Sequence, residues 1–118
     1  MLKVAMLSKW HVHAGGYASQ LKNSGKVEIV AVWDDEERGE NWAKELGCEF
    51  IPCLDTLLAR EDIEAVICDT PTTAHHDILV KAAKAGKHIF TEKALCPTVA
   101  ECLDVKKAVE EAGVTFCI

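Results

Sequence analysis

The chain has little of what several large classes of protein require. Its 118 residues carry 13 basic against 19 acidic side chains, a formal net charge of -6. A nucleic-acid interface needs a surplus of Lys and Arg, so none is expected. No apolar run approaches the roughly 20 residues that span a bilayer. The first residues lack a cleavage site of small residues and predict a strand instead of a signal peptide. We therefore expect a cytoplasmic protein without a membrane partner.

The six cysteines contain no C-x-x-C pair. Such a pair is what usually seeds a zinc site, so its absence argues against one here. Cys68 and Cys117 stand in strand-like apolar runs, where a thiol behaves as a small apolar side chain. We interpret the cysteines as structural core thiols, with a metal or disulfide role as the alternative.

Short apolar runs alternate along the chain with longer segments of helical period. Strands are expected at 3–7, 27–33, 48–51, 65–69, 88–91 and 114–117, and helices at 14–23, 36–46, 54–59, 74–85 and 99–112. Nearly continuous apolar strands are typical of a parallel sheet covered on both faces. The alternation predicts one α/β domain over residues 1–118, a doubly wound (Rossmann) parallel sheet of about six strands with helices on both faces.

Several residues predict where the helices begin and end. Thr98 and Glu101 form a capping box at the start of the last helix, whose apolar face is expected to include Val99, Leu103 and Val105. Glycines suited to a left-handed C-terminal cap follow three helices, at Gly47, Gly86 and Gly113.

Ligands of an open parallel sheet bind outside the carboxyl ends of its strands. Asp34 ends the second strand, where a carboxylate accepts hydrogen bonds from both ribose hydroxyls of a dinucleotide and repels a 2′-phosphate. Arg38, four residues on, would temper that repulsion, so NAD is the predicted cofactor and NADP stays open. As an alternative, Asp34 or Asp35 only caps the helix that starts near Glu36.

The first loop lacks the G-x-G-x-x-G pattern that lets a pyrophosphate approach the backbone. It reads Ser8-Lys9-Trp10-His11-Val12-His13-Ala14-Gly15-Gly16. Ser8 and Lys9 can contact phosphate through a hydroxyl and a charge, whereas the bulky Trp10 restricts the approach of a cofactor. His11 and His13 resemble a metal pair, but no carboxylate is near them in sequence. For these two histidines, packing or hydrogen bonding at the helix start is favoured over metal binding, so no metal is predicted. His13 is also a predicted cofactor contact.

Later motifs resemble those of one family. The stretches Asp69-Thr70-Pro71-Thr72-Thr73-Ala74-His75, Ala85-Gly86-Lys87-His88 and Thr91-Glu92-Lys93 are similar to T-P-N-x-x-H, A-G-K-H-V and E-K-P in the N-terminal domain of the glucose–fructose oxidoreductase and inositol dehydrogenase (Gfo/Idh/MocA) family. The resemblance implies NAD(P)-dependent hydride transfer to or from sugars, cyclitols and related hydroxyl compounds.

The resemblance also implies roles by position. Thr70 and Pro71 would border the nicotinamide, His75 would lie beside it, and Glu92 would contact the cofactor ribose. Lys93 would be the catalytic residue, because an ammonium close to the substrate oxygen favours a developing alkoxide. As an alternative, Glu92 and Lys93 form an ordinary exposed ion pair.

Three departures from the family pattern affect these expectations. The first loop is poor in glycine, Thr72 stands where the family has Asn, and Ala94 replaces the Pro of E-K-P. The family's second domain, which supplies much of the substrate pocket, has no counterpart in 118 residues. We therefore expect no turnover by this chain alone, and self-association through uncovered apolar surface. The alternative function is a non-catalytic, Rossmann-shaped sensing or interaction module that has lost dinucleotide binding.

Overall fold

The computed structural model describes all residues, 1–118, as alternating strands and helices. The strands are β1 (Leu2–Leu7), β2 (Val27–Trp33), β3 (Glu49–Phe50), β4 (Ala65–Cys68), β5 (His88–Thr91) and β6 (Phe116–Cys117), and the helices are α1 (Ala14–Asn23), α2 (Arg38–Leu46), α3 (Leu54–Leu58), α4 (Thr72–Lys84) and α5 (Val99–Ala112). None of these helices is long and apolar enough to cross a membrane.

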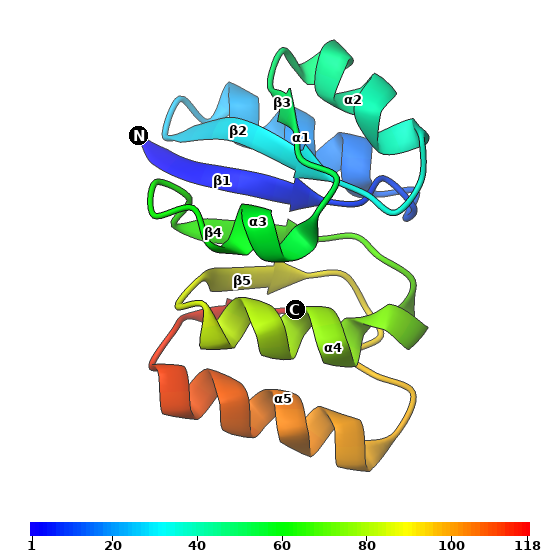
Figure 1. Cartoon of the computed structure of the whole chain (residues 1–118), viewed down its shortest axis with the longest axis vertical. Helices are drawn as coiled ribbons and strands as arrows, with labels where there is room; N and C mark the ends of the chain where they lie inside the picture. The colour runs from blue at the N-terminus through cyan, green and yellow to red at the C-terminus, as the bar shows by residue number, and fades with distance from the viewer.

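The six strands form one parallel sheet in the order β3-β2-β1-β4-β5-β6. The chain starts in the middle of the sheet, moves outward to β3, crosses back to β4 and then moves outward to β6 (Figure 1). The order therefore reverses between β1 and β4, which are neighbours. This is the strand order of the doubly wound dinucleotide-binding fold, so the predicted fold class is confirmed.

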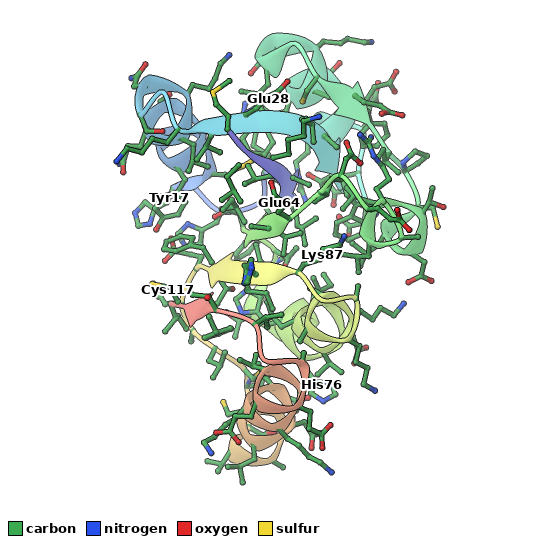
Figure 2. The ribbon with its side chains drawn as sticks, turned by 90° about the vertical axis from the view of Figure 1, so that its left-hand side faces the viewer. Tyr17, Glu28, Glu64, His76, Lys87 and Cys117 are labelled. Atoms are coloured by element: carbon green, nitrogen blue, oxygen red, sulfur yellow. The ribbon has the colours of Figure 1, made fainter.

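Helices cover both faces of the sheet. On one face, Met6 of β1 packs in a buried cluster with Trp42 of α2. On the other face, Val66 of β4 packs with Leu79 of α4 and Val105 of α5. Figures 1 and 2 show α1 and α4 on opposite sides of the sheet. This two-sided cover explains why the strands are apolar at nearly every position instead of at alternate ones.

α1 and α5 have the predicted bounds, and the other three helices differ from theirs by one or two residues. α2 begins at Arg38 and not at 36, because Gly39 and Glu40 donate to carbonyls three residues back, in a tighter turn than an α-helix. α4 begins directly after Pro71, whose carbonyl accepts from the Ala74 amide at 2.9 Å. β3 and β6 are only two residues long and each pairs on one side alone.

The start of α5 is confirmed, but its predicted buried face is partly wrong. Thr98 Oγ1 accepts a hydrogen bond of 3.2 Å from the Glu101 amide. Val105 is buried as expected, whereas 76% of Val99 and 59% of Leu103 are exposed. The reason is that α5 lies at one end of the molecule, beside α4 (Figure 1). Only Val105 and Ala108 of this helix are buried. The three glycines after α2, α4 and α5 all adopt the predicted left-handed conformation.

The cysteines do not all lie in the core. Cys68 in the central strand β4 is fully buried, as predicted. Cys53 and Cys117 are exposed, so their interpretation as core thiols is wrong. Cys117 ends β6, an edge strand with a neighbour on one side only, and its side chain therefore stays accessible. All six thiols are free.

One glycine is required for the packing of α2. Gly39 lies in the first turn of α2, against the end of β2. A Cβ atom added at this position would overlap the Cβ of Asp34 and lie 3.1 Å from the Phe50 ring. Because Asp34 is held at the carboxyl end of β2, the close approach of α2 fixes one wall of the sheet edge described below.

We predict that Gly39→Ala lowers the free energy of unfolding by about 1–3 kcal/mol, because the added methyl overpacks a tight contact. The matched control is Gly16→Ala in α1, where nothing lies within 4 Å of an added Cβ. That change should be neutral or stabilising by up to about 1 kcal/mol, since alanine is the better helix former. Urea unfolding measures both, and equal effects would contradict the close contact.

Candidate functional site

Four loops meet at one edge of the sheet. Because all strands are parallel, the carboxyl ends of β1, β2, β4 and β5 lie on the same side, at the heads of the arrows in Figure 1. The segments that follow them are residues 8–13, 34–37, 69–71 and 92–98. Every site residue predicted from the sequence lies in one of these segments or in the first turn of α2 or α4. Figure 2 looks onto the opposite edge, where Glu28, Glu64 and Lys87 lie.

The first loop begins with a left-handed turn at Ser8. Its φ of +73° lies in the region that favours glycine. The Ser8 hydroxyl is buried, donates to Asp34 Oδ1 at 3.1 Å and accepts from the Trp10 amide at 3.0 Å. These bonds hold the loop in the course that the first glycine of the dinucleotide motif normally allows. Trp10 is 49% exposed, and its ring meets the His11 ring edge-on, with 6.0 Å between the ring centres.

The carboxylate of Asp34 is saturated with donors. Oδ1 accepts from Ser8 Oγ, the Asp35 amide and Arg38 Nη2, and Oδ2 accepts from the Lys9 amide and Arg38 Nε, at 2.9–3.1 Å. The side chain of Asp34 has no exposed surface. Burial acts to raise the pKa of Asp34, but the bonds from Arg38 and the Lys9 amide outweigh it and lower that pKa. The guanidinium of Arg38 is therefore the accessible part of this pair.

The alternative that Asp34 or Asp35 caps α2 is wrong, because the residue at the N-cap is Glu37 and no side chain caps the helix. The guanidinium of Arg38 also meets Glu36 at 2.9 Å and Asp35 at 3.4 Å, so it is surrounded by carboxylates. The Lys9 ammonium, which was expected to contact phosphate, points to α2. It lies 3.2 Å from Glu45 and 5.6 Å from the centre of the Trp42 ring.

Three side chains surround the carboxylate of Glu92 at the end of β5. His13 Nδ1 lies 2.9 Å from Glu92 Oε2, and the Tyr17 hydroxyl donates to the same oxygen. His11 Nδ1 lies 3.8 Å from it. We call these four residues the Glu92 cluster. The second carboxylate oxygen of Glu92, Oε1, accepts a hydrogen bond of 3.0 Å from the Lys93 amide.

The cluster shifts the pKa values of two of its members. Burial acts to raise the pKa of Glu92, but the hydrogen bonds from Tyr17 and His13 outweigh it and lower the pKa to about 2. The bond to Glu92, followed by burial, raises the pKa of Tyr17 to about 12. The cluster therefore contains an ionised carboxylate and a neutral phenol at neutral pH.

A second carboxyl group lies beside the cluster. Asp69 is fully buried directly after β4, and neither of its carboxyl oxygens has a hydrogen-bond partner. Its main-chain carbonyl accepts from the His11 amide at 3.0 Å, and the carbonyl of Cys68 accepts from the Glu92 amide at 2.9 Å. Burial, and then repulsion from Glu92, raise the pKa of Asp69 to about 7.

His75 joins two of the loops. It is fully buried in the first turn of α4, with one ring nitrogen 3.0 Å from the Thr70 carbonyl and the other 3.0 Å from the Leu95 carbonyl. Thr70 is buried as well, whereas Lys93 is exposed. No ion pair joins Lys93 to Glu92, so the alternative of an ordinary Glu92–Lys93 pair is wrong.

The first turn of α1 is open toward this edge. The amides of Gly15 and Gly16 donate no hydrogen bond within the chain, as is usual for the first turn of a helix. A Cβ atom at either position would meet nothing within 4 Å. The two late glycines thus leave a helix N-terminus that an anion can approach, which fits a pyrophosphate.

No role was predicted from the sequence for the side chains of Tyr17 and Asp69, nor was the proximity of Glu92 to the two histidines. Tyr17 follows His13 by four positions on one helix face, a spacing that could have indicated their contact. Asp69 directly follows a buried strand, and that position could have marked it. The carboxylate beside the two histidines is Glu92, which is 79 residues from His13 in the sequence. No local pattern reveals this proximity.

The strand order and the loops at its reversal point define a dinucleotide-binding domain of the Rossmann class. Residues 11–118 match the oxidoreductase family with an NAD-binding Rossmann fold, GFO_IDH_MocA. The chain belongs to this family, which confirms the resemblance drawn from its motifs and NAD as the cofactor of its fold.

Relatives of known name are much longer than this chain. The 2,7-anhydro-N-acetylneuraminate hydratase of Escherichia coli K12 is 44% identical over 90 residues, which are 76% of this chain and 24% of that protein. The NAD-dependent scyllo-inositol 2-dehydrogenase of Bacillus subtilis 168 is 39% identical over 90 residues, 75% of this chain and 26% of the enzyme. The chain thus spans about a quarter of the curated relatives that it matches.

A solved structure is similar over almost the whole chain. The crystal structure of GenD2 from gentamicin A biosynthesis, in complex with NAD, superimposes with a TM-score of 0.91 at 27% sequence identity. The similarity covers 98% of this chain and 33% of GenD2.

The raised pKa of Asp69 predicts a pH dependence of stability. In the folded chain the pKa of this carboxyl group is about 7, against 3.8 for an aspartate side chain in water. Asp69 is therefore expected to lower the stability progressively as the pH rises between those two values. The Asp69→Asn variant should lose less stability than the wild type between about pH 4.5 and about pH 8 in urea unfolding.

The control for this prediction is Glu28→Gln, an exposed carboxylate on β2 that should keep the wild-type pH dependence. The lowered pKa of Glu92 acts below this pH range and does not interfere. An Asp69→Asn variant with an unchanged pH dependence would show that the buried carboxyl group does not titrate as described.

Proposed function

We propose that residues 1–118 are one NAD-binding domain of an oxidoreductase that transfers hydride to or from a hydroxyl-bearing carbon of a sugar or cyclitol. The observation that carries this proposal is the open first turn of α1 at the reversal point of the sheet. Membership of an oxidoreductase family with an NAD-binding fold supports it. The activity itself is proposed for the whole protein, whose relatives include an inositol dehydrogenase.

The pyrophosphate is proposed to lie over the first turn of α1. The free amides of Gly15 and Gly16 point along the helix axis, and the helix dipole favours a negative charge there. Ser8 keeps the loop in its left-handed turn, and His13 adds a ring that is 57% exposed. These features replace the usual spacing of three glycines, because each keeps either the turn or the open approach that glycines provide.

The adenosine ribose is proposed to bind beside Asp34 and Arg38. The guanidinium of Arg38 is the exposed donor there, and its two hydrogen bonds to the buried carboxylate of Asp34 hold it in place. The carboxylates of Asp34, Asp35 and Glu36 outnumber this one cation. Their excess negative charge disfavours a 2′-phosphate, so the proposed preference is for NAD over NADP.

The nicotinamide is proposed to lie near β4 and β5, bordered by Thr70 and Pro71, with Glu92 beside its ribose. When bound, the cofactor supplies a ring that accepts or donates hydride. Lys93 is exposed at this edge, where its ammonium can stabilise an alkoxide that develops on the substrate. His75 is proposed as a positioning residue, because it ties the loop of Thr70 to the loop that follows Lys93.

Two further parts of the proposal concern the whole protein. The six free thiols fit a reducing compartment, and we propose the cytoplasm. We also propose self-association, for which exposed apolar side chains near the last helix and strand offer a surface: Val99, Leu103 and Ile118.

We predict that the 118-residue chain binds NAD in calorimetric titration and that Gly16→Asp weakens the affinity by at least about tenfold. The added carboxylate would repel the pyrophosphate, whereas its effect on folding should be small, because an acidic residue is favourable in the first turn of a helix. The matched control is Asn23→Asp, which adds the same charge at the other end of α1 and should leave NAD affinity unchanged.

Equal NAD affinities of the Gly16→Asp and Asn23→Asp variants would contradict the proposed pyrophosphate site. If NAD, NADH, NADP and NADPH all fail to bind the wild-type chain, the non-catalytic sensing module becomes the better account.

A second candidate activity for the whole protein is the addition of water to an anhydro sugar acid. The 44% identity to a 2,7-anhydro-N-acetylneuraminate hydratase favours it. The two activities can be told apart by the amount of reduced nicotinamide. A dehydrogenase changes this amount as product forms, whereas a hydratase forms product without a net change in it.

A further inference from the structure

The Glu92 cluster has the composition of a metal site. His11, His13 and Glu92 each offer one ligand atom, and these atoms lie within 4.8 Å of one another. Two of the ligands come from the loop after β1, and the third comes from the end of β5. The fold therefore assembles the set from segments that are distant in sequence. The His11 amide donates to the carbonyl of Asp69, directly after β4, and the Glu92 amide donates to the carbonyl of Cys68, the last residue of β4.

Asp69 is a second, independent observation that favours a cation at the cluster. Its carboxyl group is fully buried and has no hydrogen-bond partner, which is costly in the absence of a partner. The main-chain carbonyl of Asp69 accepts a hydrogen bond of 3.0 Å from the His11 amide, so this residue lies directly beside the cluster. A cation between the two histidines and Glu92 would offset this unpaired group.

The charge balance at the cluster also favours a cation. The only ion-pair partners of Glu92 are the two histidines, and no Lys or Arg side chain reaches it. Two carboxyl groups, Glu92 and Asp69, thus lie together without a permanent positive charge. A divalent ion would supply that charge.

The ligand types indicate which ions fit. Two imidazoles and one carboxylate suit zinc, cobalt, nickel or ferrous iron, whereas magnesium and calcium prefer sets made of oxygen atoms. Tyr17 and the Lys93 amide both donate to Glu92, in the way that outer groups orient a metal-binding carboxylate. For Nδ1 of His13 to bind a metal ion, the ring proton has to lie on Nε2, so the 2.9 Å hydrogen bond from Nδ1 to Glu92 is lost. The ring can carry its proton there because 57% of the side chain is exposed.

We propose that His11, His13 and Glu92 bind one divalent transition-metal ion at the carboxyl edge of β1 and β5, with Asp69 as a negative charge beside it. This site goes beyond the proposed function, because dinucleotide binding and hydride transfer by the cofactor need no metal. The ion would also fix the first loop to the end of β5, next to the open turn of α1.

The test is titration of the 118-residue chain with Co²⁺, followed by its visible absorption, and with Zn²⁺, followed by calorimetry. One ion per chain should bind, with the absorption of a site that contains nitrogen ligands. His13→Gln and Glu92→Gln should each weaken binding by at least about tenfold. His13 is exposed, so His13→Gln should fold even if Glu92→Gln does not, and circular dichroism verifies folding of both.

The matched control is His76→Gln. His76 lies between two carboxylates, Asp77 at 2.8 Å and Asp104 at 3.0 Å, on the exposed surface of α4 and α5. Metal affinity should be unchanged in this variant. No binding by the wild type, or an equal loss in His76→Gln and His13→Gln, would overturn the proposal.

The failure of this proposal and the failure of the proposed function are distinguishable. NAD binding is measured in the presence of a chelator, and metal binding is measured in the Gly16→Asp variant as well. Retained metal binding in Gly16→Asp supports a site made by the cluster alone. Its loss in that variant would overturn the ligand assignment, because Gly16 offers no ligand side chain.

Discussion

The hydrogen bonds to the carboxylate of Glu92 are the contacts on which this edge of the molecule depends. They link the end of β5 to the loop after β1 and to the first turns of α1, across β4, which separates the two strands in the sheet. Without them, the loop would be held by two main contacts, the bond from Ser8 to Asp34 at its start and the bond from the His11 amide to the Asp69 carbonyl. The open turn of α1 and the exposed Lys93 keep fixed positions relative to one another, because Glu92 contacts His13 and Tyr17 on one side and the Lys93 amide on the other.

The second constraint is the way in which a loop poor in glycine keeps the course of a glycine-rich one. Ser8 adopts the left-handed turn itself and offsets its cost with hydrogen bonds made by its hydroxyl group. Asp34, saturated by five donors, connects this loop to α2 through Arg38. Gly39 then lets α2 approach the Cα and Cβ atoms of the same residue closely. The glycine motif is thus changed in sequence, but the first turn of α1 stays open to a ligand.

The sequence predicted the fold well, because the deciding signals are local. Continuous apolar strands report cover on both faces, and glycines after helices report left-handed caps. The exposed Val99 and Cys117 were misread, because their environment depends on which elements lie at the ends of the layers. The contacts of Glu92 with His13 and Tyr17 were missed for a similar reason, since only the strand order brings β5 close to the loop after β1.

The dinucleotide is proposed to lie over the first turn of α1 although the usual glycine pattern is absent. Two-dimensional amide NMR of the chain during titration with NAD tests this most directly. We expect the signals of Gly15 and Gly16 to shift. The signals of Gly25 and Gly86, which precede β2 and β5 at the opposite edge, should stay in place. Shifts confined to Gly25 and Gly86, or no shift at Gly15 and Gly16 with saturating NAD, would contradict it.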